Sequence, residues 1–192
     1  FEDGGFPYRH QYYVKSSDNG KTWSQPKEAL IRWDRTDHMN EFYLGNIIQE
    51  PVRPGVPDRW HFAYVLSGGQ VHDQYQEDLY HAAFCPENDH FYSAAGNDLG
   101  EFIDQEEMES KCLVFKYGPT TVKSYINPVS VDDQGVPRVD MYFKWNGQAW
   151  VVSEPHGLGE EITCYEWDHG KMYAYGGGVQ IFESSDKGDN WV

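Results

Sequence analysis

Apolar and polar residues alternate with a period of two along most of this chain, which is the pattern of β-strands that bury one face. The segments with this pattern are rich in Tyr, Phe, Trp and Val, and Gly, Pro, Asn or Asp residues bound them. They cover residues 10–17, 59–66, 77–84, 138–145, 148–154, 171–177 and 179–185. We therefore expect an all-β fold.

Tight turns join these segments in clusters. VDDQGVP, KWNGQAW and WDHGKMY each place Gly where a tight turn needs a positive φ angle. A four-stranded meander of about 45 residues is one blade of a β-propeller. Four such units, the outer two incomplete, fit residues 1–33, 40–98, 124–161 and 162 onward. DQEEMESKCLVF, residues 104–115, is the one segment suited to a helical turn, but we favour a solvated acidic loop there.

An eight-residue turn occurs twice, as SSDNGKTW at Ser16–Trp23 and as SSDKGDNW at Ser184–Trp191. The Asp accepts hydrogen bonds from turn amides, Gly adopts a conformation that other residues avoid, and we expect the Trp to fill the gap between sheets. Both segments resemble the Asp-box (BNR) repeat of sialidases and other propellers, although Asn190 stands where Thr is usual. We expect Asp18 and Asp186 to be structural, with calcium binding as the alternative.

The place of these turns suggests that the chain covers part of a ring. In such blades the Asp-box turn joins the third strand to the fourth. The chain would then start inside one blade and stop before the last strand of another. We therefore expect residues 1–192 to form part of a single propeller domain, about half of a ring that has seven blades when complete. The remainder of the propeller is expected outside this chain.

Composition excludes two classes of partner. The 192 residues include 31 acidic and 15 basic side chains, and no Lys/Arg stripe interrupts the negative charge. Such a chain repels nucleic acid and anionic membrane surfaces. No apolar run approaches the length of about 18 residues that spans a bilayer. The three cysteines, Cys85, Cys112 and Cys164, form no CxxC motif, and whether two of them are bridged stays open.

Candidate chemistry gathers in residues 67–92, SGGQVHDQYQEDLYHAAFCPENDHFY. A Gly-rich loop leads into a strand in which alternation places Tyr80 and Ala82 on one face and His81 and Ala83 on the other. The loop carries His72, Asp73, Tyr75 and Gln76. We expect these loop residues to project at one end of the propeller, where such folds bind ligands.

The order of motifs resembles the propeller polysaccharide lyases, which include the ulvan lyases and the rhamnosyl-glucuronate lyase that acts on gum arabic. FPYRHQYYVKSSDNGKTW, RWHFAYVL, HDQYQEDLYHA and INPVSVDDQGVPRVDMYFKWNGQAW carry this resemblance along most of the chain. The family motif H-x2-Y-x2-[DN]-L-Y-[YH]-A corresponds here to residues 72–82. Gln76 departs from the family, whose members often carry a basic residue after the tyrosine.

The resemblance implies β-elimination at a glucuronate. A cation must neutralise the carboxylate before a base can remove the proton at C5, and an acid then protonates the leaving O4. The expected catalytic residues are His72, Tyr75 and Arg9. The expected substrate contacts are Arg53, Asp73, Gln76 and Tyr80. We expect no metal in the site, a structural divalent cation such as calcium as the open option, an acidic oligo- or polysaccharide as partner, and a secreted or periplasmic location.

Each assignment has a structural alternative. Arg9 and Arg53 are equally suited to pairing with carboxylates at the surface, His72 to satisfying a turn, and Tyr80 to packing in its strand. The net charge favours a sparsely charged substrate, such as a terminal glucuronate capped by rhamnose. A sialidase is the first alternative function, but six scattered arginines without a FRIP-like segment weaken it. A glycan-binding propeller without catalysis is the second.

Overall fold

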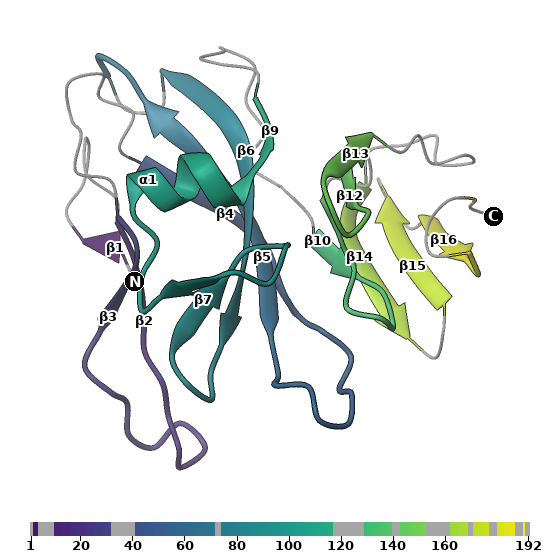
Figure 1. Cartoon of the computed structure of the whole chain (residues 1–192), viewed down its shortest axis with the longest axis horizontal. Coiled ribbons are helices and arrows are strands. Elements are labelled where there is room, and N and C mark those ends of the chain that lie inside the picture. The colour runs from purple at the N-terminus through teal and green to yellow at the C-terminus, as the bar shows by residue number, and fades with distance from the viewer. Residues whose placement is uncertain are drawn as a thin grey trace.

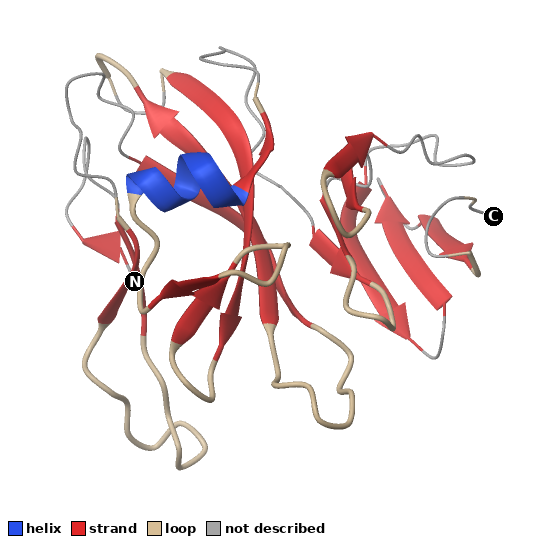
Figure 2. Ribbon diagram, in the orientation of Figure 1, coloured by secondary structure: helices blue, strands red, loops and turns tan. Residues whose placement is uncertain are grey.

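The computed structural model describes residues 2–3, 10–31, 41–71, 74–116, 129–139, 143–152, 162–168, 171–176, 180–186 and 190. In this part of the chain the fold is all-β except for one short helical segment (Figures 1 and 2). The strands form four sheets that follow one another along the chain. Each sheet begins within one of the four units expected from the sequence, but the second sheet extends beyond the expected 40–98, because its last strand reaches Phe115. No described helix is both long enough and apolar enough to cross a membrane.

The first and second sheets occupy the N-terminal part of the chain. The first contains β1 (Glu2–Asp3), β2 (His10–Tyr13) and β3 (Lys27–Leu30). The second contains β4 (Glu41–Gln49), β5 (Trp60–Gly68), β6 (Tyr75–Cys85), β7 (His90–Tyr92), β8 (Asp98–Gly100) and β9 (Leu113–Phe115). Consecutive strands β4 to β8 pair antiparallel, and β9 pairs with β6.

The third and fourth sheets lie to the right in Figure 1 and are also antiparallel meanders. The third contains β10 (Val129–Val131), β11 (Pro137–Val139), β12 (Phe143–Trp145) and β13 (Trp150–Val152). The fourth contains β14 (Ile162–Asp168), β15 (Lys171–Gly176) and β16 (Gln180–Ser184).

Two local expectations were wrong. Residues 138–145 form two strands instead of one, because Val139 pairs antiparallel with Phe143. The acidic segment at 104–115 is not a loop: helix α1 (Gln105–Glu107) continues as a π-helical turn over Met108–Cys112. Oδ1 of Asp104 accepts a hydrogen bond from the backbone N of Glu107 (2.9 Å) and caps this helix. Met108 and Cys112, four residues apart, anchor it in the core.

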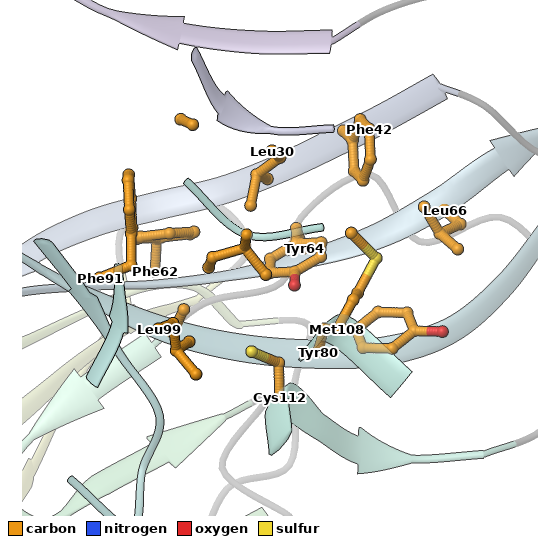
Figure 3. Close-up of a cluster of buried hydrophobic side chains, with 13 residues drawn as sticks. Leu30, Phe42, Phe62, Tyr64, Leu66, Tyr80, Phe91, Leu99, Met108 and Cys112 are labelled. Carbon is orange, nitrogen blue, oxygen red and sulfur yellow. The ribbon is translucent and has the colours of Figure 1, made fainter. Parts of the chain in front are cut away.

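Strands β5 and β6 are buried on both faces. On one face Tyr64 and Tyr80 stack with ring centroids 5.3 Å apart, in a cluster that includes Leu30 of β3 and Met108 (Figure 3). On the other face Val65 and other apolar residues of the second sheet pack against the third sheet. The second sheet is therefore the central layer between the first sheet and the third.

One side chain extends the pairing of β4 toward the third sheet. Nδ2 of Asn46 donates to the backbone O of Val129 (3.1 Å), and the backbone N of Val129 donates to Oδ1 of Asn46 (2.6 Å). The Asn46 amide thereby imitates a strand partner for β10. Burial of both apolar faces and this amide pair hold the second and third sheets together.

The repeated turn has the same hydrogen bonds in both copies. Oδ1 of Asp18 accepts from the backbone N of Thr22 (2.9 Å) and Oδ2 accepts from Oγ1 of Thr22 (2.7 Å). In the second copy Oδ1 of Asp186 accepts from the backbone N of Asn190 (2.8 Å) and Oδ2 accepts from Nδ2 of Asn190 (2.6 Å). The Asn190 amide therefore replaces the threonine hydroxyl. Hydrogen bonds from Thr22 and Ser16 lower the pKa of Asp18 to about 2.

We expected Trp23 to fill a gap between sheets, but it does not. Its side chain is 61% exposed, at the end of the turn that joins β2 to β3. Lys15 and Lys27, which flank this turn, both form ion pairs with Asp89 in the connection between β6 and β7. These two ion pairs fasten the turn to the second sheet.

Candidate functional site

The structure describes four of the seven residues that the sequence singled out. Arg53 lies in the connection from β4 to β5, whereas Tyr75, Gln76 and Tyr80 belong to β6. Arg9, His72 and Asp73 lie outside the described residues. The four described residues therefore decide which part of the fold is the candidate site.

Tyr75 begins β6 at one end of the central sheet and is half-buried. Its phenolic oxygen accepts a hydrogen bond from Nε2 of Gln74 (3.1 Å). Oε1 of the same glutamine accepts from the backbone N of Gln70 (2.7 Å), so that Gln74 braces both the loop and the phenol. Because the phenol accepts this bond, its own O–H proton stays available to another acceptor.

A glycine keeps the loop close to this tyrosine. Gly69 has φ of +124°, and a Cβ added there would lie 2.7 Å from Cβ of Gln74 and 3.0 Å from Cδ2 of Tyr75. Every other residue would clash with the loop as well as strain the backbone. Gly69 therefore lets the loop fold back over the start of β6.

A β-bulge at Asp78 decides which way Tyr75 points. Val65 of β5 pairs with Leu79, and the next residue, Leu66, pairs with Glu77, so that Asp78 is the extra residue of β6 at this point. Asp78 has a positive φ of 49° and is 1% exposed. The extra residue reverses the alternation of β6, because side chains in a strand change faces at each residue.

The effect of the bulge is visible in the core. Tyr75 packs against the same buried cluster as Tyr80, although the two are five positions apart in the sequence and simple alternation would place them on opposite faces. The [DN] preference in the motif quoted above has a physical reason here, since Asn and Asp tolerate the left-handed conformation better than other non-glycine residues.

Tyr80 and Gln76 do not face solvent in this structure, since both are 0% exposed. The hydroxyl of Tyr80 donates to Oε1 of Glu109 (3.2 Å), and burial together with the Glu109 charge raises the pKa of Tyr80 far above its ordinary value. A tyrosine in that environment neither ionises nor touches a substrate. This is a correction to the expected substrate contacts: we assign Tyr80 and Gln76 to the core.

Arg53 lies at the opposite end of the central sheet from Tyr75. Gly68 pairs with Tyr75, whereas Trp60, which follows the Arg53 connection, pairs with Phe84. The nine residues of β5 separate these two ends by about 26 Å. Arg53 instead donates to Oε2 of Glu50 (2.8 Å) and to the backbone O of Gln134 (2.6 Å). This too is a correction, because the structure does not bring Arg53 and Tyr75 together.

Three strands begin at the Tyr75 end of the molecule. Nε2 of Gln11, near the start of β2, donates to the backbone O of Phe42, near the start of β4 (3.2 Å). Glu41 pairs with Ser67, whose Oγ donates to the backbone O of Tyr75 (2.9 Å). The first residues of β2, β4 and β6 therefore lie at the same end. In the sequence Arg9 directly precedes β2, and His72 and Asp73 directly precede Gln74.

A second polar group, which the sequence analysis missed, lies between the central and third sheets. Nδ1 of His61 is 3.1 Å from Nε2 of His81, and Nε2 of His61 is 3.6 Å from Oε2 of Glu50. The His81 ring meets Trp150 of β13 edge to face at 5.2 Å. Both histidines are buried, with exposures of 4% and 1%. Period-two alternation places His61 on the face of Val65 and His81 on the face of Leu79. This alternation was the sequence signal that could have predicted the histidine pair.

Burial sets the protonation of this group. Desolvation lowers the pKa of His61 although Glu50 opposes the shift, and it lowers the pKa of His81 well below its ordinary value. Desolvation would raise the pKa of Glu50, but His61 and Arg53 beside the carboxylate reverse that shift. Neutral histidines beside a charged Glu50 are therefore the stable state at neutral pH.

The described residues include no group of three or more His, Cys, Asp or Glu side chains arranged to hold a metal ion. Both carboxylate oxygens of Asp18 accept hydrogen bonds within its own turn. Cys85 and Cys112 are buried free thiols, and burial raises the pKa of Cys112 to about 12.

Comparisons with known proteins give a fold relationship. No family model matches the chain, and no curated protein matches it. Among solved structures, a PL25 ulvan lyase superimposes with a TM-score of 0.63 at 17% sequence identity. A structure of a PL25 ulvan lyase bound to -[GlcA(1-4)Rha3S]- gives the same values. The match covers 96% of this chain and 49% of the lyase chain, so that this chain spans about half the length of the lyases it resembles.

Replacing Asp78 by Ala should destabilise the protein more than replacing it by Asn, by about 1 kcal/mol, because Ala tolerates φ of 49° less well. Urea unfolding of the two variants measures the difference. D78G, which keeps the backbone conformation but removes the side chain, separates the two effects. Equal stabilities of D78A and D78N would contradict a backbone role for the bulge.

Acid should weaken the protein through the histidine pair. The folded state holds both histidines neutral, so the unfolded state binds more protons below its ordinary histidine pKa near 6.5. Stability is then present above that pH and falls as the pH drops, by about 1.4 kcal/mol per pH unit for each proton. Unfolding in urea between pH 7.5 and 5 should show a shallower fall for His81→Gln than for the unchanged protein.

The matched control is His90→Gln, because His90 is 34% exposed on β7 and pairs with Asp98 instead of with His61 or His81. This variant removes an exposed ion pair but leaves the buried histidines, so it should keep most of the slope of the unchanged protein. An H81Q slope equal to that of the unchanged protein would rule out the buried pair as the source of the pH dependence.

Proposed function

We propose that this chain belongs to a polysaccharide lyase that cleaves at a uronic acid by β-elimination. The observation that carries the proposal is the superposition of almost the whole chain on PL25 ulvan lyases. The substrate printed for one of those structures contains glucuronate, and we extend that substrate class to this chain. A terminal or sparsely placed glucuronate in a plant gum or algal glycan is the form we favour.

The four successive meanders support the further proposal that the sheets are blades of a β-propeller. In this arrangement the two turns with matching hydrogen bonds are Asp-box repeats. A chain that aligns with half of a larger lyase would contribute about half of the ring, which we expect to have seven blades. The rest of the ring would then complete the substrate cup.

Tyr75 is the catalytic residue that the described geometry supports. It begins β6 at one end of the central sheet, Gly69 lets the loop fold over its ring, and its hydroxyl keeps a transferable proton. Arg9 and His72 complete the proposed site because they precede β2 and Gln74, at the strand ends that lie together. Asp73 is the proposed contact to a substrate hydroxyl.

The proposed β-elimination begins at the uronate carboxylate. The Arg9 cation pairs with the uronate carboxylate and thereby acidifies the C5 proton. A base, His72 in our proposal, removes that proton, and the electron pair of the C5–H bond forms the C4–C5 double bond. The C4–O4 bond breaks, and the Tyr75 hydroxyl protonates the leaving O4. The products are an unsaturated uronate and a new free hydroxyl on the other sugar.

Incubation of the whole protein with gum arabic, ulvan and sialyl-lactose tests this proposal. A lyase produces ultraviolet absorbance from the new double bond with at least one of the two uronate glycans. Release of free sialic acid would favour a sialidase instead. Retention of glycan without any product would favour a binding propeller, and both results would overturn the lyase.

Tyr75→Phe should lower kcat on the responsive glycan by about 100-fold or more, because Phe fills the same space but has no proton to give. Tyr80→Phe is the matched control, since Tyr80 lies on the same face of the same strand but is buried. Y80F should keep its activity once folding is confirmed by circular dichroism. A fully active Y75F would remove Tyr75 from the mechanism.

A further inference from the structure

A hollow of about 340 Å³ lies between the central sheet and the β12–β13 hairpin of the third sheet. Trp145 and Trp150 form one wall, and Asn97, Ser110 and Lys111 bring polar groups to it. Trp145 and Trp150 are half-buried, whereas the three polar residues are exposed. The hollow therefore combines flat apolar rings with hydrogen-bonding groups that are open to solvent.

The aromatic wall is held rigidly from behind. Trp145 and Trp150 are direct partners across the β12–β13 ladder, and their rings meet at 5.8 Å with planes inclined by 65°. Trp150 in turn packs edge to face on the buried ring of His81 at 5.2 Å. A contact surface that is already ordered loses little conformational entropy when a ligand binds.

Internal hydrogen bonds orient the three polar residues but leave donors and acceptors for a ligand. Nδ2 of Asn97 donates to Oγ of Ser93 (3.2 Å), which leaves the Asn97 amide oxygen for a ligand hydroxyl. Oγ of Ser110 donates to the backbone O of Glu106 (2.6 Å) and can still accept a hydrogen bond. Nζ of Lys111 forms an ion pair with Oε1 of Glu107 (3.1 Å) and has two further N–H donors.

We propose that this hollow binds a sugar unit of a uronate-bearing glycan. Sugar rings have an apolar C–H face that stacks on an indole, and hydroxyls at the ring edge that pair with an amide and a hydroxyl. Lys111 supplies the charge for a carboxylate at the edge of the same ring. The choice of a uronate rests on the proposed function, whereas the choice of a sugar rests on the two indoles and their polar neighbours.

This site is separate from the Tyr75 end. Trp150 and Val114 of β9 belong to the apolar contacts between the central and third sheets, whereas Tyr75 packs on the other face of the central sheet. Figure 1 shows β9 on the side of the central sheet that faces β12 and β13. The hollow would therefore hold one part of a long glycan and leave the proposed catalytic residues free.

Electrophoresis of the whole protein through native gels that contain gum arabic, ulvan or carboxyl-reduced gum arabic measures this binding without any need for turnover. Tyr75→Phe serves as the parent so that the glycans stay intact. Trp145→Ala should weaken retardation by about fivefold or more in apparent Kd, and Trp145→Tyr should restore most of it. Lys111→Ala should weaken retardation by the uronate glycans and leave that by the reduced glycan unchanged.

Trp23→Ala is the matched control, because Trp23 is exposed in a turn outside this hollow. It should migrate as its parent does. Unchanged retardation in W145A, or an equal loss in W23A, would overturn the site, and a Lys111→Ala effect on the reduced glycan would overturn the uronate assignment. Lyase activity with unchanged W145A retardation refutes this inference alone, whereas W145-dependent retardation without product refutes only the proposed lyase.

Discussion

The double burial of β5 and β6 is the constraint on which the described structure depends. A one-residue slip in register moves every side chain of a strand to the opposite face. Tyr64 and Tyr80 fill one side of these two strands, and Val65 and Leu79 fill the other. A slip would therefore place aromatic rings where smaller side chains pack, and smaller side chains where the rings pack. The pairing of this hairpin therefore sets the positions of the sheets on either side.

The Asp78 bulge is the one exception to this regular pairing, and it separates two tasks within a single strand. After the bulge, from Leu79 onward, side chains alternate strictly between the two cores, and His81 lies against His61 and Trp150. Before the bulge the alternation is reversed, so that Tyr75 lies on the Tyr80 face at the start of the strand. Gly69 and Gln74 hold its ring and hydroxyl there. A strained residue in a strand interior has a cost, and the new direction of Tyr75 is what the strain achieves.

Period and turn chemistry were enough to predict the all-β class, the four units and the faces of Tyr80 and His81, because these features depend on neighbours along the chain. Three features depend on contacts between distant segments and were missed. The helix at Gln105–Cys112 forms because Met108 and Cys112 reach a core built by other strands. Arg53 lies at the wrong end for a site with Tyr75, which only the ladder reveals. The direction of Tyr75 follows from a bulge that alternation alone does not predict.

Net charge also has to be considered locally. The formal charge of −16 does not exclude an acidic glycan, because salt screens charges beyond about 8–10 Å at physiological ionic strength. Many carboxylates are moreover neutralised in place, as Asp89 is by Lys15 and Lys27, or used inside turns, as Asp18 is. What a uronate meets is then the field of its nearest few residues. A single oriented cation such as Lys111, beside a rigid indole wall, is therefore compatible with a strongly acidic chain.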